Sequence, residues 1–337
     1  MKTSKKTPIT FGSGAAINDE MLYVTSFIDA IAPEINHTRM FVLNLALPGL
    51  WFHHDIIDKT VVSVAVRPAS DAKPRVAYAL CTDGTVETYN SNSTLNEAIP
   101  MRENAGSLSS ITHIGNRTYA CGAENQIFYR SNNFWEETGV SFRDDAVNIL
   151  KEIATEIKSG KELNILELTK KTRTLTLFEC IKGTSENNIY TCGTNGMVLH
   201  WNGHEWQQSQ SGTRQHLHDI HCVTPDDIIM CGHNGVVIRG NHTNGFRRMP
   251  IEKTDINFWS VRLFNKSLYL GSTSGLFCVT KNTLIKASFG TITLPSQYSI
   301  ESIDTTDNTL WVITNKFILR LNTGTWKIIE LPDNDQL

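Results

Sequence analysis

The chain has 337 residues, of which 40% are hydrophobic and 19% are charged, a balance typical of a globular protein and not of a disordered one. Its formal net charge of −3 gives no general attraction to nucleic acid or to an anionic membrane, so neither is expected as a partner. The sequence contains no run of about 18 apolar residues, so no membrane-spanning helix is expected.

The seven cysteines are an odd number, and no two of them form a C-x-x-C pair. Several occupy the same place in a repeat described below, where a small buried side chain suffices. The N-terminal stretch is basic, but it leads into no apolar segment of the kind that a secretory signal needs. We therefore expect reduced, buried thiols and a cytoplasmic protein.

In chain order, residues 1–14 are interpreted as a loose, basic leading segment and residues 15–337 as one repetitive domain. The first unit has three apolar, β-branched or aromatic runs, which polar or proline-containing breaks separate at 20–27, 38–45 and 50–56. Six further units follow, at 61–99, 107–138, 175–212, 215–252, 255–290 and 298–333.

The clearest unit is the stretch from Ile189 to Trp206, IYTCGTNGMVLHWNGHEW. Its apolar runs are joined by Asn-Gly turns, which tolerate the positive φ that a hairpin needs. The pattern returns 39 residues later, from Gly193 to Gly232, and again 39 residues later at Gly271. A period near 40 residues with four short strands is typical of one blade of a β-propeller.

We therefore predict an all-β fold, a single seven-bladed β-propeller, with six or eight blades as the alternatives. One blade cannot bury both faces of its sheet alone, so blades stack radially around an axis. A helical solenoid is excluded because the units alternate at period two and carry Gly/Asn turns where helices would run.

One segment, about 140–174, breaks the rhythm and predicts a short helical insertion between the third and fourth blades. Ser141 and Asp144 resemble a capping box. Apolar residues then follow at helical spacing on one face, while Glu152 and Glu156 lie mainly on the other side. Two interpretations remain open: the apolar stripe packs on the rim of the propeller, or the insertion helps to hold a partner.

The unit around Gly193 is similar to a widespread bacterial propeller repeat, G-x-x-G-x-hydrophobic-x-x-aromatic-x-G-x-x-W, which is met here by Gly193, Gly196, Trp201, Gly203 and Trp206. The chain resembles the broad BNR, YVTN and WD40-like propellers and no single characterised family. It departs from them in lacking the WD40 signature residues and the sialidase-type Asp box. The resemblance implies a fold that hosts hydrolases, lyases, lectins and scaffolds alike.

The densest polar cluster is QHLHDIH, which contains His216 and His218, with His233 one strand later. His216 and His218 point to the same side of a strand and are expected to approach the central channel. A metal site needs three or four converging ligands, and the equivalent positions of other blades are not ligand-rich. We therefore expect ordinary hydrogen-bonded histidines, with no metal and no cofactor.

Two other groups suggest acid–base chemistry. His53 precedes His54 and Asp55 and follows the aromatic pair that begins at Trp51, an arrangement that would suit a general base beside a sugar platform. Adjacent residues of a strand face opposite ways, which argues against a concerted role. The carboxylate pairs 144–145 and 226–227 are more typical of a helix start and a turn than of a glycosidase.

The sequence contains no P-loop, dinucleotide, G-x-S-x-G or H-E-x-x-H motif. Trp135, Trp206 and Trp326 sit at matching repeat positions near blade ends and are expected in the core, whereas Trp51 and Trp259 do not match this register. Trp259, beside Phe258 and with Arg262, is the choice for an exposed aromatic anchor. The residues predicted to bind a partner are Phe258, Trp259, Arg262, Trp51, His53, His216, His218, Glu152 and Glu156.

Three functions remain open. The leading hypothesis is a non-enzymatic propeller that binds another protein. Bacterial proteins similar to it include immunity proteins that neutralise a cognate toxin by direct binding, which is the specific expectation. The alternatives are a carbohydrate-active enzyme or lectin that uses the central channel, and an assembly factor or scaffold. A strongly acidic or metal-binding mouth with an open pocket would favour chemistry, and a plugged, neutral channel with an acidic or apolar rim would favour binding.

Overall fold

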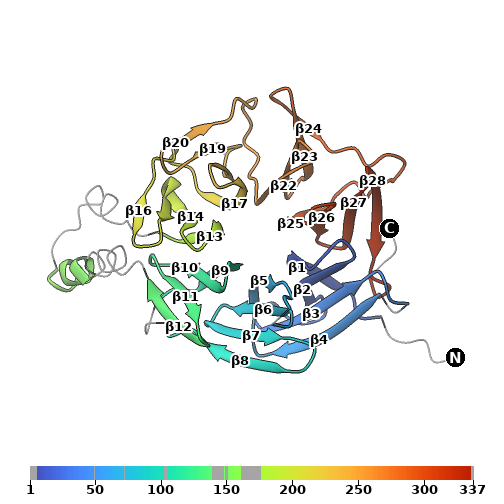
Figure 1. The fold of residues 1–337 in the computed structure, drawn as a ribbon, viewed down its shortest axis with the longest axis horizontal. Helices are drawn as coiled ribbons and strands as arrows, with labels where there is room; N and C mark the ends of the chain where they lie inside the picture. The colour runs from blue at the N-terminus through green and yellow to red at the C-terminus, as the bar shows by residue number, and fades with distance from the viewer. Residues whose placement is uncertain are drawn as a thin grey trace.

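The computed structural model describes residues 6–48, 50–71, 73–101, 105–138, 148, 151–160 and 176–334. The strands of these residues form seven antiparallel sheets of four strands each, arranged as blades around a central axis (Figure 1). The predicted all-β, seven-bladed propeller is therefore confirmed. In the part of the chain described, no helix is long and apolar enough to cross a membrane.

Each blade is formed by four consecutive strands, and the expected repeat units coincide with the blades. In chain order the blades are β1 (Ile9–Ala16), β2 (Met21–Ile28), β3 (His37–Asn44) and β4 (Trp51–Ile57); β5 (Val61–Arg67), β6 (Val76–Cys81), β7 (Thr85–Tyr89) and β8 (Thr94–Ala98); β9 (Leu108–Ile114), β10 (Arg117–Gly122), β11 (Ile127–Ser131) and β12 (Phe134–Thr138); β13 (Phe178–Ser185), β14 (Asn188–Gly193), β15 (Val198–Trp201) and β16 (Trp206–Gln208); β17 (Leu217–Thr224), β18 (Asp227–Gly232), β19 (Val237–Asn241) and β20 (Gly245–Arg248); β21 (Ser260–Phe264), β22 (Ser267–Ser272), β23 (Gly275–Thr280) and β24 (Thr283–Lys286); and β25 (Ile300–Thr305), β26 (Thr309–Thr314), β27 (Phe317–Asn322) and β28 (Thr325–Glu330).

The core lies between neighbouring blades. In β14 and β18 every residue after the first is buried, because both faces of these second strands are covered by adjacent sheets. One cluster, for example, joins Tyr190 and Val198 of the fourth blade to Leu217 and Met230 of the fifth. Each sheet therefore depends on its neighbours for burial of its apolar faces.

The predicted leading segment of residues 1–14 is wrong in part, because β1 begins at Ile9 and is the innermost strand of the first blade. Two glycines in β1 interrupt the alternating sequence pattern that is typical of a strand. A Cβ at Gly12 would lie 2.7 Å from Thr25 Oγ1, and one at Gly14 would lie 3.1 Å from the side chain of Ile313. The close packing of β1 against β2 and the last blade thus requires residues that have little strand character by themselves.

At five of the seven junctions between blades, one position of the innermost strand connects the blade to its neighbour. Its side-chain oxygen accepts a hydrogen bond from a backbone N–H of the next innermost strand. The bonds are Ile111 N to Ser63 (3.1 Å), Ile181 N to Ser110 (3.4 Å), Val261 N to Asp219 (2.9 Å), Ile303 N to Ser260 (3.0 Å) and Gly14 N to Ser302 (3.1 Å). We call this set the inner ring.

The ring of blades closes between β25–β28 and β1–β4 without exchange of a strand. Asn334, which follows the last strand, is buried and contacts both sides of this junction: Ile9 N donates to its Oδ1 (2.8 Å), and its Nδ2 donates to the Lys316 carbonyl (2.9 Å). Phe11 N also donates to the Asn315 carbonyl (2.9 Å). The two ends of the described chain are therefore joined by side-chain and backbone hydrogen bonds at this seam.

Part of the expected insertion is described, and residues 151–158 of it are helical and lie outside the ring (Figure 1). Glu152 is exposed and Glu156 is half-buried. Ile157 of the apolar stripe is 55% exposed. The predicted capping box of Ser141 and Asp144 lies outside the described residues.

Candidate functional site

Three of the residues predicted to bind a partner come together at one mouth of the central channel. They are His216, His218 and Trp259, and His233 joins them. The ring centroids of His216 and His218 are 4.3 Å apart, and those of His218 and His233 are 4.6 Å apart. The Trp259 ring lies 4.2 Å from that of His218. We call these four residues and Glu179 the mouth cluster.

The ends of four strands position this cluster. His218 lies at the start of β17, and His233 directly follows β18. The backbone N–H of His233 donates to the His216 carbonyl (2.9 Å), which fixes the two residues side by side. Trp259 directly precedes β21, and its N–H donates to the Gly271 carbonyl (2.9 Å). Backbone hydrogen bonds next to strand ends thus hold His216, His233 and Trp259, and β17 itself holds His218.

Glu179 reaches the cluster from β13 of the neighbouring blade. Its Oε1 lies 3.0 Å from His216 Nε2. This distance is that of an ion pair, but His216 Nε2 has no hydrogen-bond partner of acceptable geometry among the described residues. The same holds for the buried Nε2 of His218. The cluster therefore contains imidazole nitrogens whose hydrogen-bonding capacity is unused.

The surroundings of His218 and His233 favour the neutral form of their imidazoles. Burial, followed by the charge of His216, lowers the pKa of His218 to about 4. Burial also lowers the pKa of His233, and His216 adds to this effect. Near neutral pH, His218 and His233 each present an imidazole with an available lone pair.

The channel below this mouth holds a cavity of about 270 Å³, and His218, Glu179, Trp259 and residues of the inner ring line it. A buried ion pair crosses its wall: Arg262 Nη1 donates to Asp219 Oδ2 at 2.6 Å. Burial opposes the charge of Arg262, but Asp219 and then Asp304 outweigh this effect and raise its pKa. Burial raises the pKa of Asp219, but Arg262, Lys182 and the hydrogen bonds from Val261 and Ser260 together outweigh it, so the pKa of that carboxyl group is lowered.

Phe258 and Arg262 do not form part of an exposed anchor. Phe258 is completely buried and packs in the core between the fifth and sixth blades. Arg262 is 7% exposed and is held by Asp219 of the neighbouring blade. Trp259 is 37% exposed, since adjacent residues of an extended chain face opposite ways. The prediction of contact with a partner is therefore corrected for Phe258 and Arg262.

Trp51 and His53 lie on β4, the last strand of the first blade, and are not part of the mouth cluster. Trp51 is half-buried, stacks on Phe11 and donates from Nε1 to the Glu330 carbonyl (3.1 Å). His53 is exposed. Asp55 is held by Arg39 (2.7 Å), which lowers the pKa of its carboxyl group, so this aspartate is engaged in an ion pair.

The carboxylate pair at 226–227 also makes contacts within the fold. Asp227 forms a two-point ion pair with Arg239, whose Nε lies 2.6 Å from Asp227 Oδ1. The carbonyl of Asp226 accepts a hydrogen bond from Asn241 (2.9 Å). These contacts agree with the interpretation of 226–227 as a turn. The pair 144–145 lies outside the described residues.

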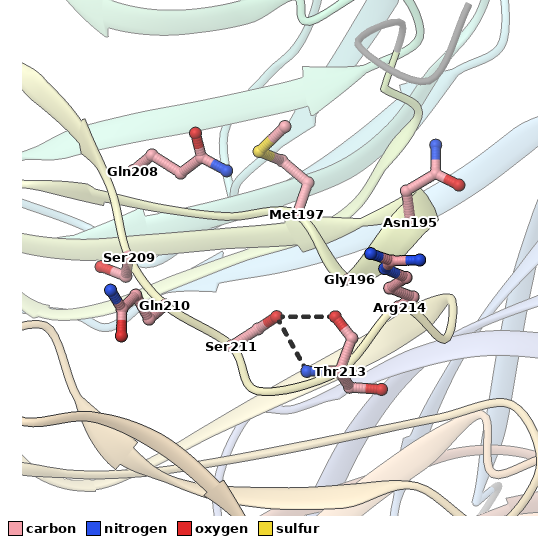
Figure 2. Close-up of a pocket in the computed structure, with 9 residues that line it drawn as sticks. All are labelled: Asn195, Gly196, Met197, Gln208, Ser209, Gln210, Ser211, Thr213 and Arg214. Carbon is pink, nitrogen blue, oxygen red and sulfur yellow. Dashed lines mark hydrogen bonds between the residues drawn. The ribbon is translucent and has the colours of Figure 1, made fainter. Parts of the chain in front are cut away.

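A separate hollow of about 740 Å³ lies beside the turn Thr194–Gly196 (η1) and the segment that follows β16 (Figure 2). Figure 2 shows amide, hydroxyl and thioether side chains around it, with Arg214 at one side. Ser211 and Thr213 are hydrogen-bonded to each other across one wall (3.1 Å). No carboxylate, histidine or cysteine is among the described residues that line it, so it offers no acid–base pair.

The comparisons with known proteins agree with this description. No protein-family profile matches the chain. Over 329 residues it is 24% identical to Immune protein Tsi7 of Pseudomonas aeruginosa, an alignment that covers 94% of this chain and 96% of that protein.

Solved structures share the architecture at low sequence identity. The WD40 β-propeller domain of Doa1 aligns with a TM-score of 0.60 at 13% identity, over 92% of each chain. YCF48 bound to D1 peptide aligns with a TM-score of 0.59 at 11% identity, over 93% of each chain. Sqt1 of Chaetomium thermophilum bound to the N-terminus of ribosomal protein L10 aligns with a TM-score of 0.58 at 8% identity, over 98% of this chain and 89% of that one. These likenesses show that the chain has the fold of the WD40-like β-propellers.

Proposed function

We propose that this chain is a non-enzymatic, protein-binding β-propeller, and specifically a bacterial immunity protein that neutralises a cognate toxin by binding it. The observation that carries the proposal is the similarity to Immune protein Tsi7, which extends over nearly the whole of both chains. An alignment of that extent includes every blade and not one repeat alone. We further propose that the protein acts in the cytoplasm, where its seven unpaired cysteines would remain reduced.

The structure supports binding more than channel chemistry. The cavity in the channel has a volume of about 270 Å³, and the Asp219–Arg262 ion pair takes up part of its wall. The rim exposes several large apolar side chains on the outer strands, namely Ile57 at 68%, Leu95 at 58% and Phe134 at 73%. Two solved propellers of the same fold are bound to peptide segments of other proteins. The mouth cluster is the one described feature that favours chemistry, and it is treated below.

For the contact surface we propose the face around the mouth cluster. Trp259 stands there partly exposed on a rigid strand end, and tryptophan is enriched among the residues that dominate binding energy. A stable complex would bury roughly 1,200–2,000 Å² in total, which requires loops of several blades around this mouth.

The function is tested by isolating the partner and measuring its toxicity. A tagged chain is purified from its own cells, and proteins present in near-equal amount are identified. The expected partner arrests growth when expressed alone, and co-expression of this chain restores growth. A stoichiometric partner without toxicity would contradict the immunity function but not binding, and repeated recovery of no partner would contradict both.

The contact surface is tested with matched aromatic variants. Trp259→Ala is expected to weaken binding of the purified partner by about 30-fold or more, because removal of a central tryptophan costs about 2 kcal/mol. Phe134→Ala, on the far edge of the third blade, is the control and is expected to leave binding within about threefold. Isothermal titration calorimetry measures both, and the reverse result would place the interface on the rim.

A further inference from the structure

We propose that His216, His218 and His233, with Glu179, bind one divalent transition-metal ion of the zinc class at the mouth of the channel. Each histidine offers one ligand nitrogen, and these three atoms lie within 4.8 Å of one another. Glu179 adds a carboxylate oxygen 3.0 Å from His216 Nε2. Three imidazoles and one carboxylate form a complete tetrahedral set for such an ion.

The geometry requires only side-chain adjustment. Nitrogens that bind one tetrahedral zinc ion at 2.0–2.1 Å are about 3.3 Å apart. The present nitrogens must therefore approach by about 1.5 Å at most, which rotation about side-chain bonds can supply. The backbone is already fixed, because His233 N donates to the His216 carbonyl and His218 and Glu179 belong to innermost strands.

Unused ring nitrogens provide an independent argument. The Nε2 atoms of His216 and His218 are buried and have no hydrogen-bond partner among the described residues. Buried polar atoms in folded proteins nearly always have a partner, so atoms without one call for an ion or a water. Both atoms belong to residues whose rings face each other at 4.3 Å, where a single ion would satisfy them together.

A second histidine pair in the same protein shows the alternative arrangement. His200 and His242 stack in parallel with centroids 3.7 Å apart. There Asn188 contacts His200 Nε2 (2.8 Å), and the Tyr190 hydroxyl contacts His242 Nδ1 (3.0 Å). Protein groups therefore contact one nitrogen of each ring, while His200 Nδ1 is buried without a partner in the described part of the chain. What distinguishes the mouth cluster among the described residues is that a third histidine and a carboxylate converge on it.

The donor set selects the class of metal. Imidazole nitrogens suit zinc, copper, nickel and iron, whereas calcium and magnesium take oxygen ligands. The Trp259 ring packs 4.2 Å from His218 and 5.8 Å from His233, and so covers one side of the site. We infer a site that holds zinc at the mouth and fixes Trp259 beside it.

The test uses the full chain, stripped of metal with a chelator and then titrated with zinc chloride by isothermal titration calorimetry. We expect one ion per chain with micromolar or tighter affinity. His218→Ala and His233→Ala are each expected to weaken binding at least about 100-fold, since loss of a ligand costs more than loss of an outer partner. His242→Ala is the matched control and is expected to leave affinity unchanged.

Two further measurements keep the result interpretable. Cobalt chloride, used in place of zinc, is expected to give the intense visible absorption of a tetrahedral site, which His218→Ala abolishes. Thermal unfolding is expected to show that the variants fold, and that zinc raises the melting temperature of the wild type but not of His218→Ala.

Two outcomes would overturn the proposal. One is the lack of saturable zinc binding by the folded wild-type chain, which would leave an ordinary packed aromatic cluster. The other is unchanged affinity in both His218→Ala and His233→Ala, which would place the ion elsewhere. Unchanged affinity in Glu179→Gln would overturn the assignment of Glu179 as the fourth ligand. None of these results depends on whether the protein binds a toxin.

Discussion

Replacement of Arg262 by methionine is expected to lower the free energy of unfolding by about 3–5 kcal/mol, because it leaves a buried carboxylate without its cation. Asp219 and Arg262 are 8% and 7% exposed, and Nη1 lies 2.6 Å from Oδ2. In the variant, Asp219 Oδ2 keeps the Ser260 hydroxyl (3.0 Å) and Val261 N–H (2.9 Å), which are neutral donors. These donors provide hydrogen bonds to the carboxylate but do not neutralise its negative charge.

A second variant separates loss of the ion pair from loss of packing. Asp219→Ser combined with Arg262→Met places at position 219 the residue that the inner ring has in β5, β9, β21 and β25. The serine hydroxyl can accept the Val261 N–H, and no buried charge remains. The double variant is expected to regain most of the loss and to lie within about 1–2 kcal/mol of the wild type.

Urea unfolding followed by tryptophan fluorescence and circular dichroism measures these free energies, and coincidence of the two signals checks two-state behaviour. The control is Arg239→Met. Its ion pair with Asp227 is equally short at 2.6 Å, but the two side chains are 43% and 26% exposed, so we expect a loss below about 1 kcal/mol. Equal losses for Arg262→Met and Arg239→Met would refute the reasoning, since burial would then contribute nothing.

Three further predictions concern the glycines, the seam and acid stability. Gly193→Ala is expected to prevent stable folding, because its Cβ would lie 1.9 Å from the Leu177 carbonyl oxygen. Gly290→Ala is the control: its Cβ would meet open space, so only the positive φ of +69° is unfavourable, and urea unfolding is expected to show a cost of about 1–2 kcal/mol. Asn334→Ala is expected to cost about 1–3 kcal/mol in the same assay, because two buried backbone groups lose their partner. Burial, followed by the charge of Arg262, lowers the pKa of His221 from 6.5 to about 4. Between these two pH values the unfolded chain binds a proton at His221 that the folded chain does not bind, so the free energy of unfolding falls as the pH drops. His221→Asn is expected to reduce that fall between about pH 7 and about pH 4.5, and an unchanged fall would assign it to other groups.

The sequence predicts the fold well because the repeat records the physics of a blade. Glycines at 193, 232 and 271 recur at intervals of 39 residues, and in the structure each lies at the end of the second strand of its blade or one residue before it. A Cβ at Gly193 or Gly232 would lie 1.9 Å from a backbone carbonyl oxygen, which explains why glycine occupies these positions. The first strand is harder to predict because β1 uses glycine where it approaches β2 and the last blade closely, and the last blade is distant in sequence.

The candidate site was predictable only in part. The placement of His216 and His218 on one side of a strand follows from the strand period. Glu179 precedes His218 by 39 residues and therefore occupies the same position of the preceding blade, but one carboxylate does not by itself indicate a ligand set. The burial of Arg262 could not be predicted, because its partner Asp219 lies in a different blade. A charged residue without a visible partner in sequence is otherwise expected at the surface.

The absence of a shared strand at the seam has a consequence for synthesis on the ribosome. Each of the seven sheets consists of four strands that are consecutive in the chain, so a blade has all its strand partners as soon as its own segment has emerged. Blades can then stack one after another on a growing arc, beginning at the N-terminal side of the chain. The seam can form only after the last blade has emerged, because Asn334, which joins β1 to that blade, follows all seven blades in the chain.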